Sequence, residues 1–251
     1  VDLATFTRLA KETGYAGISE EDVDAANFEE AEESYLNGKY ERSSVLLGHY
    51  LNGFPNGRFR QNAHYYKADC HVRMDERDSA LTQFEYLLEQ PGNPYYENAL
   101  YMSAKLSREL GKTDKMYSYY QLLYQSSGNK QYQSEALDYL IKTGYEKEEY
   151  LKVIQWTEAV ISDEKRQDNE RQNALLYEVN SYLKLGEKTK ALNLVMRANY
   201  DLRDETTAEL SYLKALLLYE EGNYTEAEAA LYFLLQHFGS FPEWRARGFI
   251  L

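Results

Sequence analysis

The segment Gly222-Asn223-Tyr224-Thr225-Glu226-Ala227 decides the fold, because related segments recur along the chain at a nearly fixed spacing. Gly186-Glu187-Lys188-Thr189-Lys190-Ala191 is a second copy, and four shorter copies precede it. The first residues of the six copies, called turn residues below, follow one another at intervals of 36 to 38 residues: Gly38, Asp75, Gly111, Glu148, Gly186 and Gly222. A period in this range is typical of proteins built from stacked supersecondary units.

Each unit has the pattern of a first helix, a short turn, a second helix and a longer connection. Before Gly222, apolar residues recur at helical spacing, and glycine can take the left-handed conformation that ends a helix. Asn223 or Thr225 is then expected to cap the second helix. Ser19 to Asp22 resembles a capping box. In the fourth unit we expect Gly144 to end the first helix early.

The segments between units contain either proline or polar residues. Pro55, Pro91, Pro94 and Pro242 follow second helices, and no proline lies between Pro94 and Pro242. In the middle units polar breaks mark the ends of the second helices instead, and these breaks span residues 126–129, 162–165 and 201–204.

Small residues recur where the two helices of a unit must approach closely. Seven residues before each turn residue stand Ala31, Ala68, Ala104, Ile141, Val179 and Ala215. Five residues after each turn residue stand Ser43, Ala80, Met116, Val153, Ala191 and Ala227.

These positions resemble the tetratricopeptide repeat (TPR). Ala215, Tyr224, Ala227 and Leu231 match its pattern in the last unit, as do Ala31, Tyr40, Leu47 and Pro55 in the first. The period is longer than the usual 34 residues, the early Trp is absent, and the fourth unit matches poorly. The resemblance implies an all-α, right-handed superhelical solenoid of about six antiparallel helix pairs. We expect one such solenoid over residues 1–251, as a fragment of a longer array, with residues 1–13 forming the second helix of a preceding repeat.

Composition limits the partners. The net charge of −13 disfavours binding to nucleic acid and to anionic lipid. No apolar run approaches the roughly 20 residues that span a bilayer, so we expect no membrane insertion by this segment. A single cysteine, Cys70, excludes a disulfide within the chain.

Two segments between units, residues 54–65 and 92–101, are similar to the inter-repeat segments of bacterial envelope TPR proteins. Those proteins include the outer-membrane assembly lipoprotein and the Tol-Pal coordinator family. This resemblance implies a bacterial scaffold and favours a periplasmic or outer-membrane-associated location, with a cytoplasmic one left open.

TPR-like arrays bind partners along the concave face that the first helices line. The resemblance therefore implies that a protein or peptide partner would contact nine residues here: Tyr35, Tyr65, Asp69, Tyr101, Lys105, Arg108, Asn180, Tyr212 and Tyr219. The chain has 25 tyrosines, and tyrosine suits interfaces because it offers a large rigid area with a polar tip. We assign about two-thirds of them to packing between helices and the remainder to exposed recognition.

Catalytic and metal-binding patterns are weak. His64, Cys70 and His71 form the single cluster of plausible metal ligands, but their spacing is unlike that of zinc sites. Acidic pairs such as Glu148-Glu149 read as solvated helix faces. We therefore expect no catalytic residue, metal or cofactor, and a non-enzymatic interaction scaffold. A glycan-binding module and a regulatory segment of a larger enzyme are the alternatives.

Overall fold

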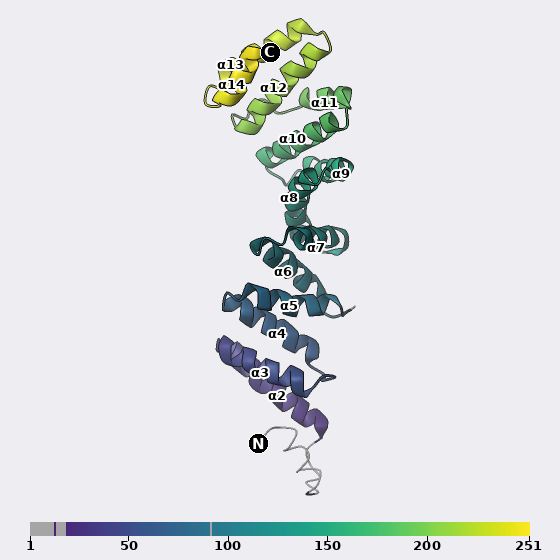
Figure 1. Cartoon of the computed structure of the whole chain (residues 1–251), viewed down its shortest axis with the longest axis vertical. Coiled ribbons are helices and arrows are strands. Elements are labelled where there is room, and N and C mark those ends of the chain that lie inside the picture. The colour runs from purple at the N-terminus through teal and green to yellow at the C-terminus, as the bar shows by residue number, and fades with distance from the viewer. Residues whose placement is uncertain (1–12, 14–18, 91) are drawn as a thin grey trace. The chain divides into compact units, whose positions relative to one another are not determined.

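The computed structural model describes residue 13 and residues 19–90 and 92–251, and these residues form helices and turns without a strand (Figure 1). The expected helix over residues 1–13 lies almost wholly outside the described residues, as does Pro91. The helices are α2 (Glu20–Leu36), α3 (Tyr40–Gly53), α4 (Arg60–Arg73), α5 (Arg77–Leu88), α6 (Tyr96–Glu109), α7 (Thr113–Ser126), α8 (Lys130–Glu146), α9 (Tyr150–Ile161), α10 (Asp168–Lys184), α11 (Lys188–Val195), α12 (Glu205–Glu220), α13 (Tyr224–His237) and α14 (Pro242–Ile250).

Of the described helices, α2 to α13 follow one another as six pairs and α14 follows the last pair, and each predicted turn residue lies inside its pair. The all-α fold of repeated helix pairs is thus confirmed. Backbone contacts divide the chain into two compact units, which meet between Tyr132 and Gln133 in the first turn of α8. The unit up to Tyr132 contains α2 to α7, and the unit from Gln133 contains most of α8 and α9 to α14. The prediction of one continuous solenoid remains a prediction.

All six turn residues have a positive φ, between 60° and 84°. At each one, the backbone N–H of the next residue donates to the carbonyl five residues earlier, over 2.8–2.9 Å. The N–H of the turn residue itself donates to the carbonyl three residues earlier. This pair of bonds defines the Schellman motif, which satisfies the last carbonyls of the first helix and reverses the chain into the second. The sequence period therefore marks a single backbone conformation.

Asp75 and Glu148 adopt this left-handed conformation without being glycine. The position of Glu148 shows that the prediction for Gly144 is wrong: α8 continues to Glu146, and Gly144 is buried within it. The carbonyl of Gly144 accepts the N–H of Glu149, so the helix ends on the motif around Glu148 and not at its internal glycine.

Two other predicted helix ends differ in outcome. The capping box at the start of α2 is confirmed, since the Ser19 hydroxyl accepts the N–H of Asp22 and the Asp22 carboxylate accepts the N–H of Ser19. The predicted cap of α13 is wrong: Asn223 occupies the cap position, but no side chain bonds to the exposed N–H groups there.

Second helices end as the polar breaks predict in two of three cases. α7 ends at Ser126 and α9 at Ile161, but α11 ends at Val195, well before the break at residue 201. Tertiary contacts explain the early end of α11. The Gln172 side chain binds both the N–H and the carbonyl of Asn199, and the Tyr200 hydroxyl donates to the carbonyl of Val195 over 2.6 Å.

The twelve predicted packing positions are all buried. Six lie on first helices and six on second helices, and the Ser43 hydroxyl donates to the Ala31 carbonyl across the first pair over 2.9 Å. Within each unit, core clusters join neighbouring pairs: one includes Phe28 of α2 and Ala63 of α4, another includes Ala68 of α4 and Ala99 of α6, and a third includes Val179 of α10 and Leu210 of α12. Small residues thus set the spacing within pairs, and larger apolar residues fill the space between them.

In three of the six pairs, a polar residue located 14 positions before the turn residue holds the connection to the next pair. Asp24 accepts the N–H of Arg58, and Glu97 accepts the N–H groups of Gly128 and Asn129. Gln172 bonds to the backbone of Asn199. In these three pairs, side chains of the first helices therefore fix the connection.

We predict that Ala68→Leu or Ala215→Leu destabilises the chain by roughly 1–3 kcal/mol. Both alanines are fully buried between paired helices, so a larger side chain would overpack the contact. Urea denaturation followed by circular dichroism measures the change. The matched control is Ala26→Leu on the exposed side of α2. Unchanged unfolding midpoints for both buried variants would contradict the close packing of the pairs.

Candidate functional site: the first-helix face

The nine predicted site residues occupy three positions on the first helices, located 10, 6 and 3 residues before the turn residue. Steps of four and three residues keep these positions on one side of a helix, which we call the first-helix face. The first position contains Tyr65, Tyr101 and Tyr212, the second contains Asp69, Lys105 and Asn180, and the third contains Tyr35, Arg108 and Tyr219.

In the unit up to Tyr132, Tyr35 and Asp69 are joined directly. The Tyr35 hydroxyl donates to Oδ2 of Asp69 over 2.7 Å, linking α2 to α4. Arg73 donates to the same carboxylate oxygen over 3.2 Å. Burial, together with the adjacent Asp69 carboxylate, raises the pKa of Tyr35 well above its usual value, so its hydroxyl remains a donor. This contact ties the first two helix pairs together.

Aromatic rings extend this network along the face. The ring of Tyr35 packs on Tyr66 at 4.7 Å between centroids, and Tyr66 meets Tyr65 edge-on. Tyr65 stacks on Tyr95 at 4.2 Å, and the Tyr95 hydroxyl accepts a hydrogen bond from Asn62. Burial raises the pKa of Tyr66 to about 12. Tyr35, Tyr65 and Asp69 are thus brought together, in contact with ring partners that the sequence did not single out.

Tyr101 belongs to a second stack in the same unit. Its ring lies parallel to that of Tyr132, 4.1 Å away. Lys105 and Arg108 lie on the same helix, and both are partly buried. Within the described residues, Lys105 forms no ion pair or hydrogen bond, which leaves its ammonium available to a ligand.

In the unit from Gln133, Asn180 of α10 and Tyr212 of α12 each contact a residue two helices later in the chain. Asn180 donates to Glu209 on α12 over 3.4 Å, and burial raises the pKa of Glu209. Tyr212 lies 5.9 Å from Trp244 on α14. Tyr219 is 48% exposed and meets Tyr224 edge-on, so it is the most accessible tyrosine of the predicted set.

Two ring pairs repeat between the pairs of helices. The first ring pair is Tyr35 with Tyr66, and the second is Tyr145 with Tyr177. In both, one tyrosine stands three residues before a turn residue, and its partner stands nine residues before the next turn residue. A comparison of these two positions along the period could have found Tyr66 and Tyr177 from the sequence. Tyr95, Tyr132 and Trp244 lie near the starts of the following helices, and the prediction missed them as well.

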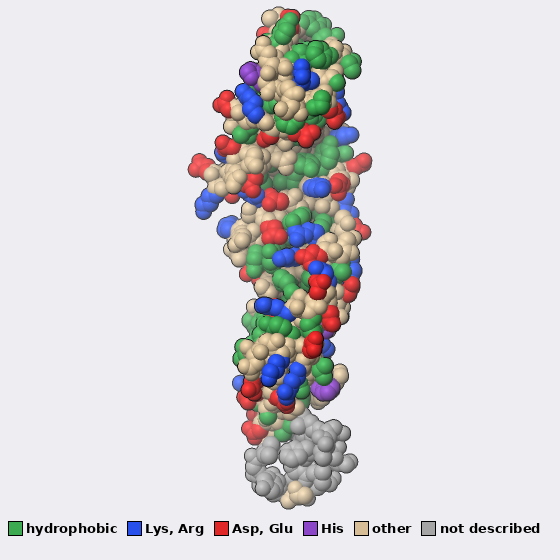
Figure 2. Space-filling view, turned by 90° about the vertical axis from the view of Figure 1, so that its left-hand side faces the viewer, with side chains coloured by type: hydrophobic (Ala, Val, Ile, Leu, Met, Phe, Trp, Pro, Cys, Tyr) green, Lys and Arg blue, Asp and Glu red, His purple; other side chains and the backbone are tan. Residues whose placement is uncertain are grey.

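The tyrosines are mostly half-buried. Among the described residues, Tyr50, Tyr117 and Tyr120 are buried, and Tyr219, Tyr224 and Tyr232 are exposed. Figure 2 shows acidic and basic side chains interspersed over one face of the molecule. The first-helix face therefore offers aromatic edges, phenol donors and a few charges.

The histidine and cysteine cluster is divided among separate contacts. His64 stacks on Tyr86 and contacts Gln83, and burial lowers its pKa to about 4. His71 contacts Glu76 over 2.6 Å, and burial raises the pKa of the Cys70 thiol. Within the described ranges, no group of three or more potential ligands could hold a metal ion. The same residues include no helix long and apolar enough to cross a bilayer.

Glu178 is the buried acid with the clearest shift. It is 5% exposed on α10, and its carboxylate meets the Thr157 hydroxyl at 3.4 Å. Burial, reinforced by the nearby charge of Glu158, raises the pKa of Glu178 to about 7. Because this side chain is enclosed between helices, we expect its protonation to affect the stability of the fold and do not propose it as a binding or catalytic residue.

We predict that the Tyr35–Asp69 hydrogen bond contributes about 1.5 kcal/mol to stability, at the low end for a bond to a charged acceptor because both groups are partly exposed. A double-mutant cycle with Tyr35→Phe and Asp69→Ala measures the coupling. Tyr224→Phe, which alters an exposed phenol that forms no hydrogen bond within the described part of the chain, is the control. If the two single changes in unfolding free energy add up to the change in the double variant, the hydrogen bond contributes no coupling energy.

We predict that Glu178→Gln becomes increasingly stabilising, relative to the wild type, as pH rises. The folded-state pKa near 7 exceeds the unfolded value of 4.5, so the folded protein binds a proton more tightly. The wild type accordingly loses stability between about pH 4.5 and 7, by roughly 2–3 kcal/mol, whereas the Gln variant does not. Urea unfolding at pH 5 and at pH 8 measures the difference in unfolding free energy between Glu178→Gln and the wild type at each pH. Glu164→Gln, in an exposed turn, is the control, and a pH-independent difference for Glu178→Gln would contradict the buried charge.

Comparisons with known proteins find similarity in structure alone. No protein-family model matches the sequence, and no curated protein matches it. A tetratricopeptide repeat protein from Parabacteroides merdae is 14% identical in sequence; the match covers 90% of this chain and 98% of that protein's chain, with a TM-score of 0.46. The apo form of the quorum sensor NprR from B. thuringiensis is 12% identical; the match covers 98% of this chain and 73% of the NprR chain, with a TM-score of 0.48. A thermophilic TPR protein from Thermus thermophilus is 19% identical; the match covers 91% of this chain and 100% of that protein's chain, with a TM-score of 0.29. The chain is similar to tetratricopeptide repeat proteins.

Proposed function

We propose that this chain is a non-enzymatic scaffold that binds a protein or peptide along the first-helix face. The observation that supports this most is the network formed by Tyr35, Asp69 and the rings of Tyr65, Tyr66 and Tyr95. These side chains are half-buried and hold one another in place, so a partner would meet them with little loss of side-chain entropy. A preorganised aromatic surface of this kind suits recognition by tyrosine anchors.

The charges on this face would add specificity. The Lys105 ammonium has no ion pair among the described residues, and Lys105 lies one helical turn after Tyr101 on α6, within a protein of net charge −13. An acidic side chain of a partner would find a cation there, and the surrounding acidic surface would disfavour wrong sites. An extracytoplasmic location depends on the resemblance of residues 54–65 and 92–101 and is part of this proposal.

We predict that a partner captured from native extract by the wild type is lost when Tyr101 and Tyr212 are both replaced by alanine. Tyr232→Ala is the matched control, because this exposed tyrosine lies on α13, a second helix. Circular dichroism and thermal melting would first establish that each variant is folded. Equal capture by the wild type and the double variant would contradict the assignment of the face.

Photocrosslinking separates a loss of contact from a loss of fold. A benzophenone amino acid replaces Lys105 on the first-helix face or, as the control, the exposed Leu122 on α7. The proposal requires partner adducts from position 105 and fewer or none from position 122. The reverse pattern would place the interface on the second helices, and adducts with a glycan in place of a protein would favour the glycan-binding alternative.

A further inference from the structure

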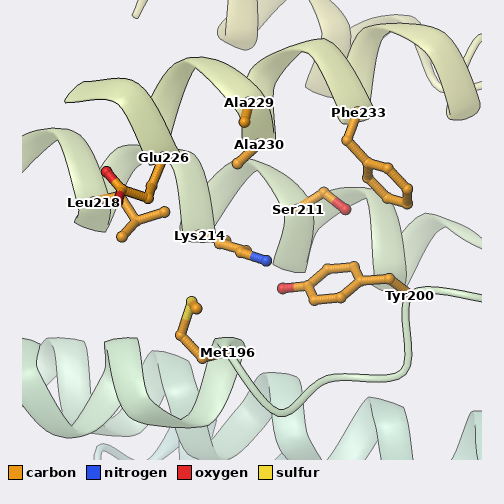
Figure 3. Close-up of a pocket in the computed structure, with 9 residues that line it drawn as sticks. All are labelled: Met196, Tyr200, Ser211, Lys214, Leu218, Glu226, Ala229, Ala230 and Phe233. Atoms are coloured by element: carbon orange, nitrogen blue, oxygen red, sulfur yellow. The ribbon is translucent and has the colours of Figure 1, made fainter. Parts of the chain in front are cut away.

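The short helix α11 leaves a cavity in the unit from Gln133. α11 has 8 residues, whereas the other five second helices have 12 to 14. Where those helices continue, this chain leaves the helix at Met196 and crosses to α12. The space that remains has a volume of about 320 Å³ and is lined by Met196, Tyr200, Ser211, Lys214, Leu218, Glu226, Ala229, Ala230 and Phe233 (Figure 3). This volume is at the small end of the range for ligand sites.

The walls of the cavity are apolar and supported. Met196, Leu218 and Phe233 contribute large apolar side chains to the lining, and Ala229 and Ala230 of α13 contribute small ones. Tyr200 forms one end: its hydroxyl is bonded to the carbonyl of Val195, and its ring meets Phe233 edge-on at 5.9 Å. The Arg203 guanidinium lies 5.6 Å from the Phe233 ring centroid. Contacts of Tyr200 and Arg203 thus hold the connection after α11 in place next to the cavity.

One cation lies inside this apolar space without an acid to neutralise it. The ammonium of Lys214 lies 4.8 Å from the ring centroid of Tyr200, and in Figure 3 the two side chains point toward each other. Within the described residues, Lys214 forms no ion pair, although the chain has 41 acidic and 28 basic side chains. Glu226 also lines the cavity, but it forms no ion pair with Lys214. An anionic group beside Lys214 would gain a charge-assisted hydrogen bond to an ammonium that no carboxylate of the described residues pairs with.

The equivalent place in the other unit has a different character. Lys67, like Lys214, stands eight residues before its turn residue, and it lines a cavity of about 560 Å³ between α3, α4 and α5. That lining is polar and includes Ser44, His71 and Gln83. The combination of an apolar body and an unpaired ammonium therefore belongs to the site at α11, and Lys67 offers a matched control.

We propose that this cavity binds a small apolar carboxylate, with the carboxylate on the Lys214 ammonium and the alkyl or aryl body against Met196, Leu218 and Phe233. Glu226, which also lines the cavity, repels a second negative charge, so the site selects monocarboxylates over dicarboxylates. This site uses none of the nine residues of the first-helix face and is independent of the proposed function.

The test is a titration of 3-phenylpropionate, followed by NMR of 13C-methyl-labelled methionine. The chain has four methionines, so the Met196 signal reports on the cavity while the other three serve as internal controls. A fragment of this size is expected to bind with a dissociation constant of roughly 0.1–1 mM. Lys214→Gln should weaken binding about tenfold, and Lys67→Gln should leave it unchanged. The neutral amide, 3-phenylpropionamide, should also bind about tenfold more weakly than 3-phenylpropionate when both are measured on the wild type.

A second variant tests the location without touching the charge. Ala229 is exposed at the cavity on α13, so Ala229→Trp should occupy the space and abolish the Met196 shift while the fold is retained. The proposal is overturned if the Met196 signal does not respond up to about 10 mM acid, a concentration well above the expected dissociation constant. It is equally overturned if the acid binds the wild type and Lys214→Gln with the same affinity, or if succinate binds as tightly as 3-phenylpropionate.

Discussion

Each described helix pair depends on one residue with a left-handed backbone. At this residue the first helix ends, its last carbonyls find donors, and the chain reverses so that the second helix can pack against the first. The residues seven before and five after it are buried in every described pair, and in the first pair the Ser43 hydroxyl bonds to the Ala31 carbonyl. A different backbone conformation at the turn would move every one of those contacts, so the packing within a pair follows from the turn.

The same constraint positions the first-helix face. Because the helix end is fixed, residues located 10, 6 and 3 positions before it keep their places from pair to pair. The Tyr35–Tyr66 and Tyr145–Tyr177 contacts show this repetition in two separate units. The cavity beside α11 arises where the repetition fails, since α11 ends early at Val195 and the Tyr200 hydroxyl bonds to the carbonyl of that residue.

The repeat period, the turn residues and the packing positions could be predicted from the sequence, because each depends on local chemistry. Glycine supplies the left-handed backbone at four turns, and the period reveals Asp75 and Glu148 at the other two. Gly144 misled the prediction, since a glycine inside a helix carries the same local signal as one at its end. The ring partners Tyr95 and Trp244 could not be foreseen, because they belong to neighbouring helix pairs. The early end of α11 could not be foreseen either, because it depends on contacts that Gln172 of α10 and Tyr200 make with the backbone after folding.

The most direct test of the central claim replaces Gly222 with L-alanine and, by semisynthesis of the last segment, with D-alanine. Gly222 has a φ of 84°, and an added L-Cβ meets no atom within 4 Å, so the comparison isolates backbone conformation from packing. D-alanine favours positive φ, and L-alanine disfavours it by roughly 1–2 kcal/mol. The account predicts that the D-alanine protein is at least as stable to urea as the wild type and that the L-alanine protein is less stable. Equal stability of the two alanine proteins would contradict the claim that the left-handed turn determines the helix pair.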